Sequence, residues 1–124
     1  AVNGNLPSNV MKRVLLFLAL AGLLTGCGAP KIYSWGRYED MVYTMYAEPG
    51  KATPEYQIEK MEADLEKARA KNKPVHPGFH AHLGYLYAQT GKLDQAKQAL
   101  ENEKAQFPES AMFVDRLLAN LQRK

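Results

Sequence analysis

The feature that most constrains this chain is a set of apolar and small residues at helical spacing between residues 77 and 110. Leu83-Gly84 is followed along this segment by Tyr87, Gly91, Leu93, Ala96, Leu100 and Pro108. Gly84 and Ala96 are small enough for two antiparallel helices to approach closely, and Gly91 can adopt the positive φ that a short inter-helix turn needs. We therefore expect a helical hairpin whose close contact is surrounded by Leu83, Tyr87, Leu93 and Leu100.

This spacing resembles the tetratricopeptide repeat, a helix–turn–helix of about 34 residues with a leucine-glycine-x-x-tyrosine signature. The resemblance covers residues 77–110. It departs at Glu103, where that family usually has alanine, and at His80, where it usually has a large aromatic residue. The departure at Glu103 predicts an unusually open face late in the second helix of the hairpin.

Proline, glycine and capping residues divide the rest of the chain after residue 33 into further helices. Ser34 can cap a helix over about 35–47, and Thr53-Pro54 opens another over 54–71 with threonine as its cap. Further helices are expected over about 77–90 and 93–106, and from Ser110 to about residue 122. No alternating strand pattern of useful length appears. The sequence predicts an all-α fold of about five helices, arranged as tetratricopeptide-like hairpins.

Each expected helix carries an apolar stripe. In the first helix the stripe is Trp35, Tyr38, Val42, Met45 and Tyr46, and in the second it is Ile58, Met61, Leu65 and Ala68. In the last helix the inward residues are Met112 or Phe113, with Leu117, Leu118 and Leu121. A single repeat cannot bury its own faces, so this last helix is expected to cap the array. The charged residues of the second helix, including Asp64–Lys67 and Glu66–Arg69, are expected to form a solvated face.

An apolar run precedes the helical part of the chain. Residues 14–24 carry no charge and follow Lys12 and Arg13. A membrane-spanning helix needs about 20 apolar residues, so this run is too short to span a bilayer. A basic start, a short apolar segment and an exit of small residues are typical of a secretory signal. We expect residues 1–26 to be an upstream extension and a cleaved signal peptide.

The exit of this run, Leu24-Thr25-Gly26-Cys27, resembles the lipobox of bacterial lipoproteins. The resemblance implies a diacylglyceryl group on the Cys27 thiol, cleavage before Cys27 and further acylation, for example with palmitate. Several acyl chains on one residue anchor a protein stably. Gly28 stands where aspartate would retain a lipoprotein in the inner membrane, which implies the periplasmic face of the outer membrane. The alternative is that Cys27 is a small apolar residue of a buried helix.

Under this interpretation residues 27–33 are a lipidated tether and residues 34–124 are the helical domain. Cys27 is the only cysteine, so no intrachain disulfide is possible. Tyr33-Ser34-Trp35-Gly36-Arg37-Tyr38-Glu39-Asp40 leads into Tyr43, Tyr46 and Pro49-Gly50-Lys51. With the lipobox and the repeat, these residues make the chain similar to a family of small proteobacterial lipoproteins described as a domain of unknown function. Its members are often encoded beside a lipoprotein similar to the curli-secretion channel, which implies an assembly role.

Charge and residue spacing argue against several classes of function. Without Lys12 and Arg13 the chain has 14 basic and 13 acidic residues, well mixed, so we expect no nucleic-acid partner. Pro77 makes His76 a cap or loop residue, so His76 and His80 do not form a helical metal pair, and we expect no metal and no cofactor beyond the lipid. His80 is expected to pack between helices. Glu101 and Glu103 point apart on a solvated helix, and no nucleophile has a base nearby, so we expect no enzyme.

Candidate partner-binding residues fall into two groups. In tetratricopeptide pairs the first helix lines a concave groove, and the matching residues here are Gly78, Ala81, Tyr85, Ala88 and Gln89. They predict a shallow groove for an extended segment or a helix, with Tyr85 exposed as an anchor, unless the first helix pair folds over and fills it. The second group is aromatic and lies near the tether: Trp35 and Tyr43 either pack in the core or touch lipid headgroups or a membrane partner.

The function expected from these features is that of a non-enzymatic outer-membrane lipoprotein. It would act as a protein-interaction adaptor in a secretion- or envelope-associated lipoprotein complex. The membrane, through the lipid, and other envelope lipoproteins or secretion proteins would be its partners. The alternative is a periplasmic module that binds peptide or peptidoglycan by itself. A cell-wall enzyme is a third possibility, which the missing catalytic site disfavours.

Overall fold

The computed structural model of the chain describes residues 4, 7–23, 28 and 30–123. Almost all the secondary structure of these residues is helical, which confirms the all-α class. Within the described residues the β-type pairing is a single parallel bridge between Ser34 and Val75. The chain divides into two units, Ala1–Lys31 and Ile32–Lys124, each of which is described by itself.

The N-terminal unit contains helix α1 (Ser8–Leu23), formed by the apolar run and the residues before it. Its large apolar side chains are exposed, among them Leu16 and Phe17. No helix of the described residues is both long and apolar enough to cross a membrane. Residues Leu24, Thr25, Gly26 and Cys27, which carry the predicted lipobox and lipid, lie outside the described residues.

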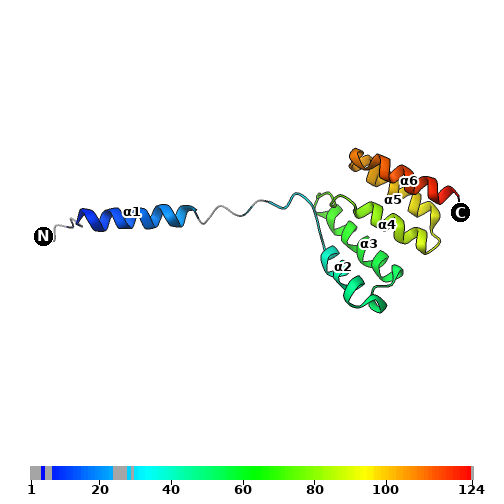
Figure 1. Cartoon of the computed structure of the whole chain (residues 1–124), viewed down its shortest axis with the longest axis horizontal. Coiled ribbons are helices and arrows are strands. Elements are labelled where there is room, and N and C mark those ends of the chain that lie inside the picture. Colours follow the sequence, from blue (N-terminus) through cyan, green and yellow to red (C-terminus); the bar gives the residue numbers. More distant parts are fainter. Residues whose placement is uncertain (1–3, 5–6, 24–27, 29, 124) are drawn as a thin grey trace. The chain divides into compact units, whose positions relative to one another are not determined.

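The second unit is a row of antiparallel helices. The helices are α2 (Tyr38–Ala47), α3 (Pro54–Ala70), α4 (Phe79–Gln89), α5 (Leu93–Gln106) and α6 (Ala111–Gln122), with 3-10 turns η1 (Pro49–Lys51) and η2 (Pro108–Ser110). Figure 1 shows α3, α4, α5 and α6 side by side in chain order, with α2 next to α3. The predicted bounds of α5, residues 93–106, are confirmed. The predicted bounds of α3, α4 and α6 differ from the observed ones by at most two residues.

The closest helix–helix contact joins α4 and α5, as the sequence predicts. A Cβ atom placed on Gly84 would lie 3.0 Å from Leu100 Cγ and 3.1 Å from the carbonyl oxygen of Ala96. Gly91 turns the chain between the two helices with a φ of 77°. The prediction for Leu93 is wrong, because this side chain is 44% exposed. It is the first residue of α5 and directly follows the turn that joins the two helices.

Two apolar clusters hold the unit together. The larger one joins α2, α3, α4 and α5 through Met41, Ile58, Met61, Ala68, Val75, Phe79, Leu83, Leu86, Tyr87, Ala96 and Ala99. The smaller one joins α4, α5 and α6 through Ala81, Leu100 and Val114, with Leu117, Leu118 and Leu121 packed against it. The inward placement of Met112 or Phe113 is wrong: both are exposed, and Val114 is fully buried. The inward placement of Leu117, Leu118 and Leu121 is confirmed, and they lie three, four and seven residues after Val114, on the same side of the helix.

The start of the helical unit differs from the prediction. Gly36, with a φ of 52°, turns the chain, so α2 begins at Tyr38 and Trp35 precedes the helix. Ser34 does not cap α2; its backbone N–H donates to the carbonyl oxygen of Pro74 at 2.8 Å. Tyr46 is 84% exposed and is not part of the stripe, whereas Met41 is buried. The second cap is confirmed, because the backbone N–H of Tyr56 donates to Thr53 Oγ1 at 3.3 Å.

Candidate functional site

A buried carboxylate caps α4, the helix that carries the predicted groove residues. Glu103 of α5 is 2% exposed, and its Oε1 accepts a hydrogen bond from the backbone N–H of Gly78 at 2.6 Å. Its Oε2 accepts from the N–H groups of His80 at 3.1 Å and Ala81 at 3.3 Å. The first N–H groups of a helix lack intrahelical partners and carry partial positive charge. The predictions of an open face and a solvated Glu103 are therefore wrong, because this carboxylate is used inside the fold.

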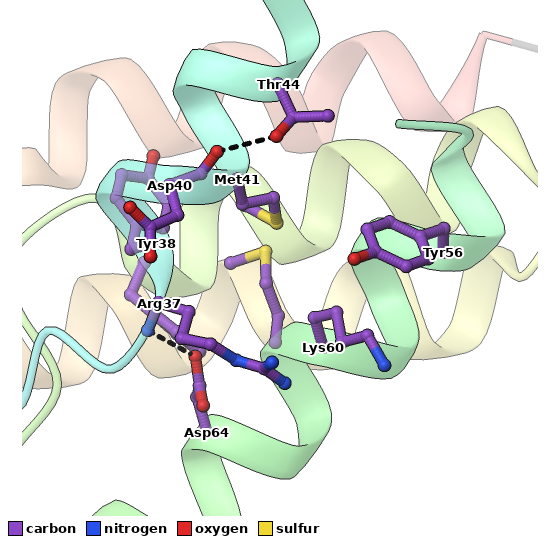
Figure 2. Close-up of a pocket in the computed structure, with 10 residues that line it drawn as sticks. Arg37, Tyr38, Asp40, Met41, Thr44, Tyr56, Lys60 and Asp64 are labelled. Carbon is purple, nitrogen blue, oxygen red and sulfur yellow. Dashed lines mark hydrogen bonds between the residues drawn. The ribbon is translucent and has the colours of Figure 1, made fainter. Parts of the chain in front are cut away.

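A second carboxylate repeats this arrangement one hairpin earlier. Asp64 of α3 is 7% exposed, and its Oδ2 accepts a hydrogen bond from the N–H of Arg37 at 2.9 Å, just before α2 (Figure 2). A Cβ atom on Gly36 would lie 2.4 Å from the same oxygen, so glycine is needed for the approach. Lys67 lies 3.8 Å from the other carboxylate oxygen. Asp64 is thus a buried cap and not part of a solvated face.

A small cavity lies between α2 and α3. Figure 2 shows residues that line it, among them Arg37, Asp40, Met41 and Lys60. Its volume is about 170 Å³, below the roughly 300–1,000 Å³ of small-molecule sites. Lys60 is already engaged, since its Nζ pairs with Glu59 at 2.9 Å and lies 5.2 Å from the centre of the Tyr56 ring. The cavity is a packing gap beside α2 and offers little room for a ligand.

The three histidines lie near the start of α4. His76 is in the loop before α4, as predicted, and is 2% exposed; the Trp35 ring stacks on it with a centroid distance of 4.2 Å. Its Nδ1 lies 2.9 Å from the carbonyl oxygen of Pro77 and so carries the proton, which leaves the buried Nε2 without a hydrogen-bond partner. His82 Nδ1 lies 3.0 Å from the hydroxyl of Tyr38. This cluster attaches the segment before α2 to the start of α4.

Burial also shifts the pKa of two of these histidines. His80 is 3% exposed, which confirms its predicted place between the helices. Burial lowers the pKa of His80; the nearby Glu103 opposes this shift and Arg69 adds to it. Burial lowers the pKa of His82 as well, with a contribution from His76. Among the described residues no three side chains of histidine, cysteine, aspartate or glutamate gather as metal ligands would.

An open apolar hollow lies between α4 and α6. This groove has a volume of about 500 Å³ and is lined by Gly84, Tyr85, Ala88, Gln89, Leu100, Leu117, Asn120, Leu121 and Arg123. No residue of α2 or α3 lines it, so the first helix pair does not fill it. Its interior is mainly apolar. Its polar groups are the Tyr85 hydroxyl, the amides of Gln89 and Asn120, and the Arg123 guanidinium.

The predicted groove residues divide in the structure. Tyr85, Ala88 and Gln89 line the groove. Tyr85 is 56% exposed, as predicted, and its hydroxyl accepts a hydrogen bond from Gln89 Nε2 at 3.0 Å. Ala81 does not line it, because Ala81 is buried beneath α6 against Leu100 and Val114. Gly78 directly precedes α4, and its N–H donates to the capping carboxylate of Glu103.

The sequence did not single out the second wall of the groove. Leu117, Asn120 and Leu121 of α6 lie three and four residues apart, so they share one helix face. This spacing can be read from the sequence, but the predicted stripe placed Leu117 and Leu121 in the core only. In the structure both residues also line the groove. Of the aromatic group near the tether, Tyr43 is 72% exposed and lies outside the core, whereas Trp35 is 40% exposed and stacks on His76.

The fold and the groove define an all-α domain, a row of antiparallel helices with an open apolar groove between α4 and α6. The chain belongs to the family described as domain of unknown function DUF4810, which matches residues 32–117. The match extends from the segment before α2 to the middle of α6 and includes both carboxylate caps. No curated protein and no solved structure matches the chain.

Proposed function

We propose that this chain is a non-enzymatic outer-membrane lipoprotein that acts as a protein-interaction adaptor in a secretion- or envelope-associated lipoprotein complex. The observation that carries the proposal is the open groove between α4 and α6, which is apolar inside and has polar groups from Tyr85, Gln89 and Asn120. The helices are proposed to be tetratricopeptide-like, with α4 and α5 as one repeat and α6 as the first helix of the next. The close contact at Gly84 and the turn at Gly91 support this interpretation.

The groove chemistry suits a peptide segment better than a small polar metabolite. Small side chains at Gly84 and Ala88 allow a backbone or an apolar side chain to approach α4 closely. Tyr85 has few rotamers, and its bond to Gln89 restricts the ring further. Rigid, partly exposed tyrosines are frequent anchors of protein interfaces. We infer that an extended or helical segment of a partner protein lies along this groove.

The test is affinity purification of the full chain from membranes, with Tyr85→Ala as the variant. Loss of this anchor should reduce partner recovery by roughly 5- to 30-fold, equivalent to about 1–2 kcal/mol. Tyr46→Ala is the matched control, because Tyr46 is also highly exposed but lies on α2, away from the groove. Thermal unfolding should be nearly unchanged for both variants. Unchanged recovery by Tyr85→Ala would contradict the groove proposal.

The same purification separates the adaptor from the second candidate, a periplasmic module that binds peptide or peptidoglycan alone. The hydroxyl and amide groups of Tyr85, Gln89 and Asn120 could also bond to the polar groups of a glycan. Co-purified lipoproteins that depend on Tyr85 support the adaptor. Binding to purified peptidoglycan sacculi that is lost with Tyr85→Ala, without co-purified lipoproteins, supports the second candidate.

We infer the membrane location from Leu24-Thr25-Gly26-Cys27, the motif that resembles a lipobox. Lipidation of Cys27 would anchor the helical unit at the periplasmic face of the outer membrane. Cells grown with radioactive palmitate should label the wild-type protein but not Cys27→Ala, which should accumulate as an unprocessed precursor. An unlabelled, soluble wild-type protein would contradict the anchor and leave the groove proposal to be tested separately.

A further inference from the structure

The exposed face of α6 carries a stripe of four residues with internal symmetry. Glu109, Met112, Phe113 and Arg116 follow one another at spacings of three, one and three residues. All four are exposed, with Met112 at 74% and Phe113 at 58%. Residues three and four apart lie on one side of a helix. Glu109 is in η2, which runs directly into α6. The stripe is acid, apolar, apolar and base, centred between Met112 and Phe113.

The two charges of the stripe are unused within the described part of the chain. Neither the Glu109 nor the Arg116 side chain forms an ion pair or hydrogen bond with another residue of the described segments. The acid of α6 itself, Asp115, pairs with Lys104 of α5 at 2.7 Å. The stripe therefore presents one free carboxylate and one free guanidinium on either side of two large apolar side chains.

We propose that this stripe joins two copies of the chain, with their α6 helices antiparallel about a two-fold axis between Met112 and Phe113. In this arrangement Glu109 of each copy faces Arg116 of the other, so two equivalent ion pairs form. Met112 of each copy faces Phe113 of the other at the centre. A two-fold interface uses the same patch on both copies, and the symmetric spacing of this stripe satisfies that requirement.

The charges of the stripe favour a second copy of this chain as the partner and an antiparallel orientation of the two α6 helices. A parallel pairing would place Glu109 against Glu109 and Arg116 against Arg116, which is repulsive. A shift of the axis toward the C-terminus leaves Asp115 as the acid near Arg116 and Arg123, and Asp115 already pairs with Lys104. The antiparallel pairing centred between Met112 and Phe113 matches opposite charges at both ends and leaves that ion pair intact.

The contact area predicts a weak dimer in dilute solution. A pair of short helices buries less surface than the roughly 1,200–2,000 Å² of a stable interface. Under the lipid anchor of the proposed function, confinement of both copies to one membrane raises their effective concentration and favours such weak contacts. The dimer is therefore best tested on the full chain in membranes.

The experiment is oxidative cross-linking of the full chain carrying Phe113→Cys in membranes. We expect at least a tenfold higher yield of disulfide-linked homodimer than for Tyr46→Cys, a more exposed site on α2. The unsubstituted chain reports any background from Cys27. Adding Glu109→Arg or Arg116→Glu to the Phe113→Cys chain should each reduce the yield to the control level. The two reversals together should restore it, because the ion pairs re-form with opposite polarity.

Rescue by the double reversal separates a self-contact from capture of another protein. A yield for Phe113→Cys no higher than for Tyr46→Cys would overturn the dimer, as would cross-links to a different protein alone. Failure of the double reversal to restore the yield would overturn the proposed orientation and with it the proposal. Circular dichroism of each variant checks that the helices remain, which is expected because both charged side chains are exposed.

Discussion

Glu103 offers the clearest test at the scale of single residues. Its carboxylate accepts hydrogen bonds from three backbone N–H groups at the start of α4. In Glu103→Gln one acceptor oxygen becomes an NH₂ group that faces N–H donors. The free energy of unfolding should fall by roughly 1.5–3 kcal/mol, the range for hydrogen bonds to a charged group. Urea denaturation measures the change. Glu101→Gln, exposed on the same helix, should shift it by about 0.5 kcal/mol at most; equal effects would contradict the cap.

Gly84 tests the contact between α4 and α5. A leucine side chain there would meet Leu100 and the Ala96 carbonyl oxygen, both already about 3 Å from the Cβ position. Gly84→Leu should destabilise the unit by roughly 1–3 kcal/mol or more through overpacking. Thermal unfolding monitored by circular dichroism measures this effect. Gly50→Leu is the matched control, because nothing lies within 4 Å of the Gly50 Cβ position. Similar melting temperatures for Gly84→Leu and the unsubstituted chain would show that the two helices pair differently.

At the scale of elements, α2 is a weakly packed helix of the second unit, as is α6, which buries only Val114. Helix α2 buries only Met41, whereas α4 buries seven of its residues. A helix with few buried apolar contacts opens locally at low free-energy cost. We therefore predict that the amides of α2 exchange with deuterium faster than those of α4 and α5. Hydrogen exchange followed by mass spectrometry measures this, and protection of α2 equal to that of α4 would contradict the prediction.

At the scale of the whole molecule, two buried histidines predict how stability depends on pH. Burial lowers the pKa of both His80 and His82 in the folded chain. The unfolded chain therefore binds protons first as the pH falls below about 6.5, and the folded state loses stability from that pH downward. Urea denaturation between pH 8 and 5.5 measures the slope. The double variant His80→Gln/His82→Gln should show a smaller slope, whatever its absolute stability; an unchanged slope would contradict the assignment.

Local patterns predicted most of the fold of the helical unit, because each helix carries its own start, stripe and stop. The bounds of α5 and the contact at Gly84 follow from residues close together in the chain. The burial of Asp64 and Glu103 does not, because their N–H partners lie 22 to 27 residues away. Nothing near Asp64 in the sequence distinguishes it from a solvated charge, and Glu103 is marked only by standing where the tetratricopeptide pattern usually has alanine.

The candidate site was predicted in part for the same reason. Tyr85 and Ala88 follow from the register of α4 alone, and the structure places both along the groove. The burial of Ala81 depends on where α6 crosses α4, which no local pattern specifies. In α6 the adjacent apolar pair Met112 and Phe113 competes with Val114 for the inward position, and only packing against α5 decides between them.

The bridge between Ser34 and Val75 determines where mechanical tension enters the helical unit. A pull on the chain before residue 34 loads the hydrogen bond from Ser34 to Pro74 first, together with the stacked rings of Trp35 and His76. The force then passes into the loop between α3 and α4, in the middle of the row of helices. The weakly packed α2 lies beyond this attachment and bears load only after it breaks. The chain can thus be held under strain from its N-terminal side while α4, α5 and α6 keep their arrangement.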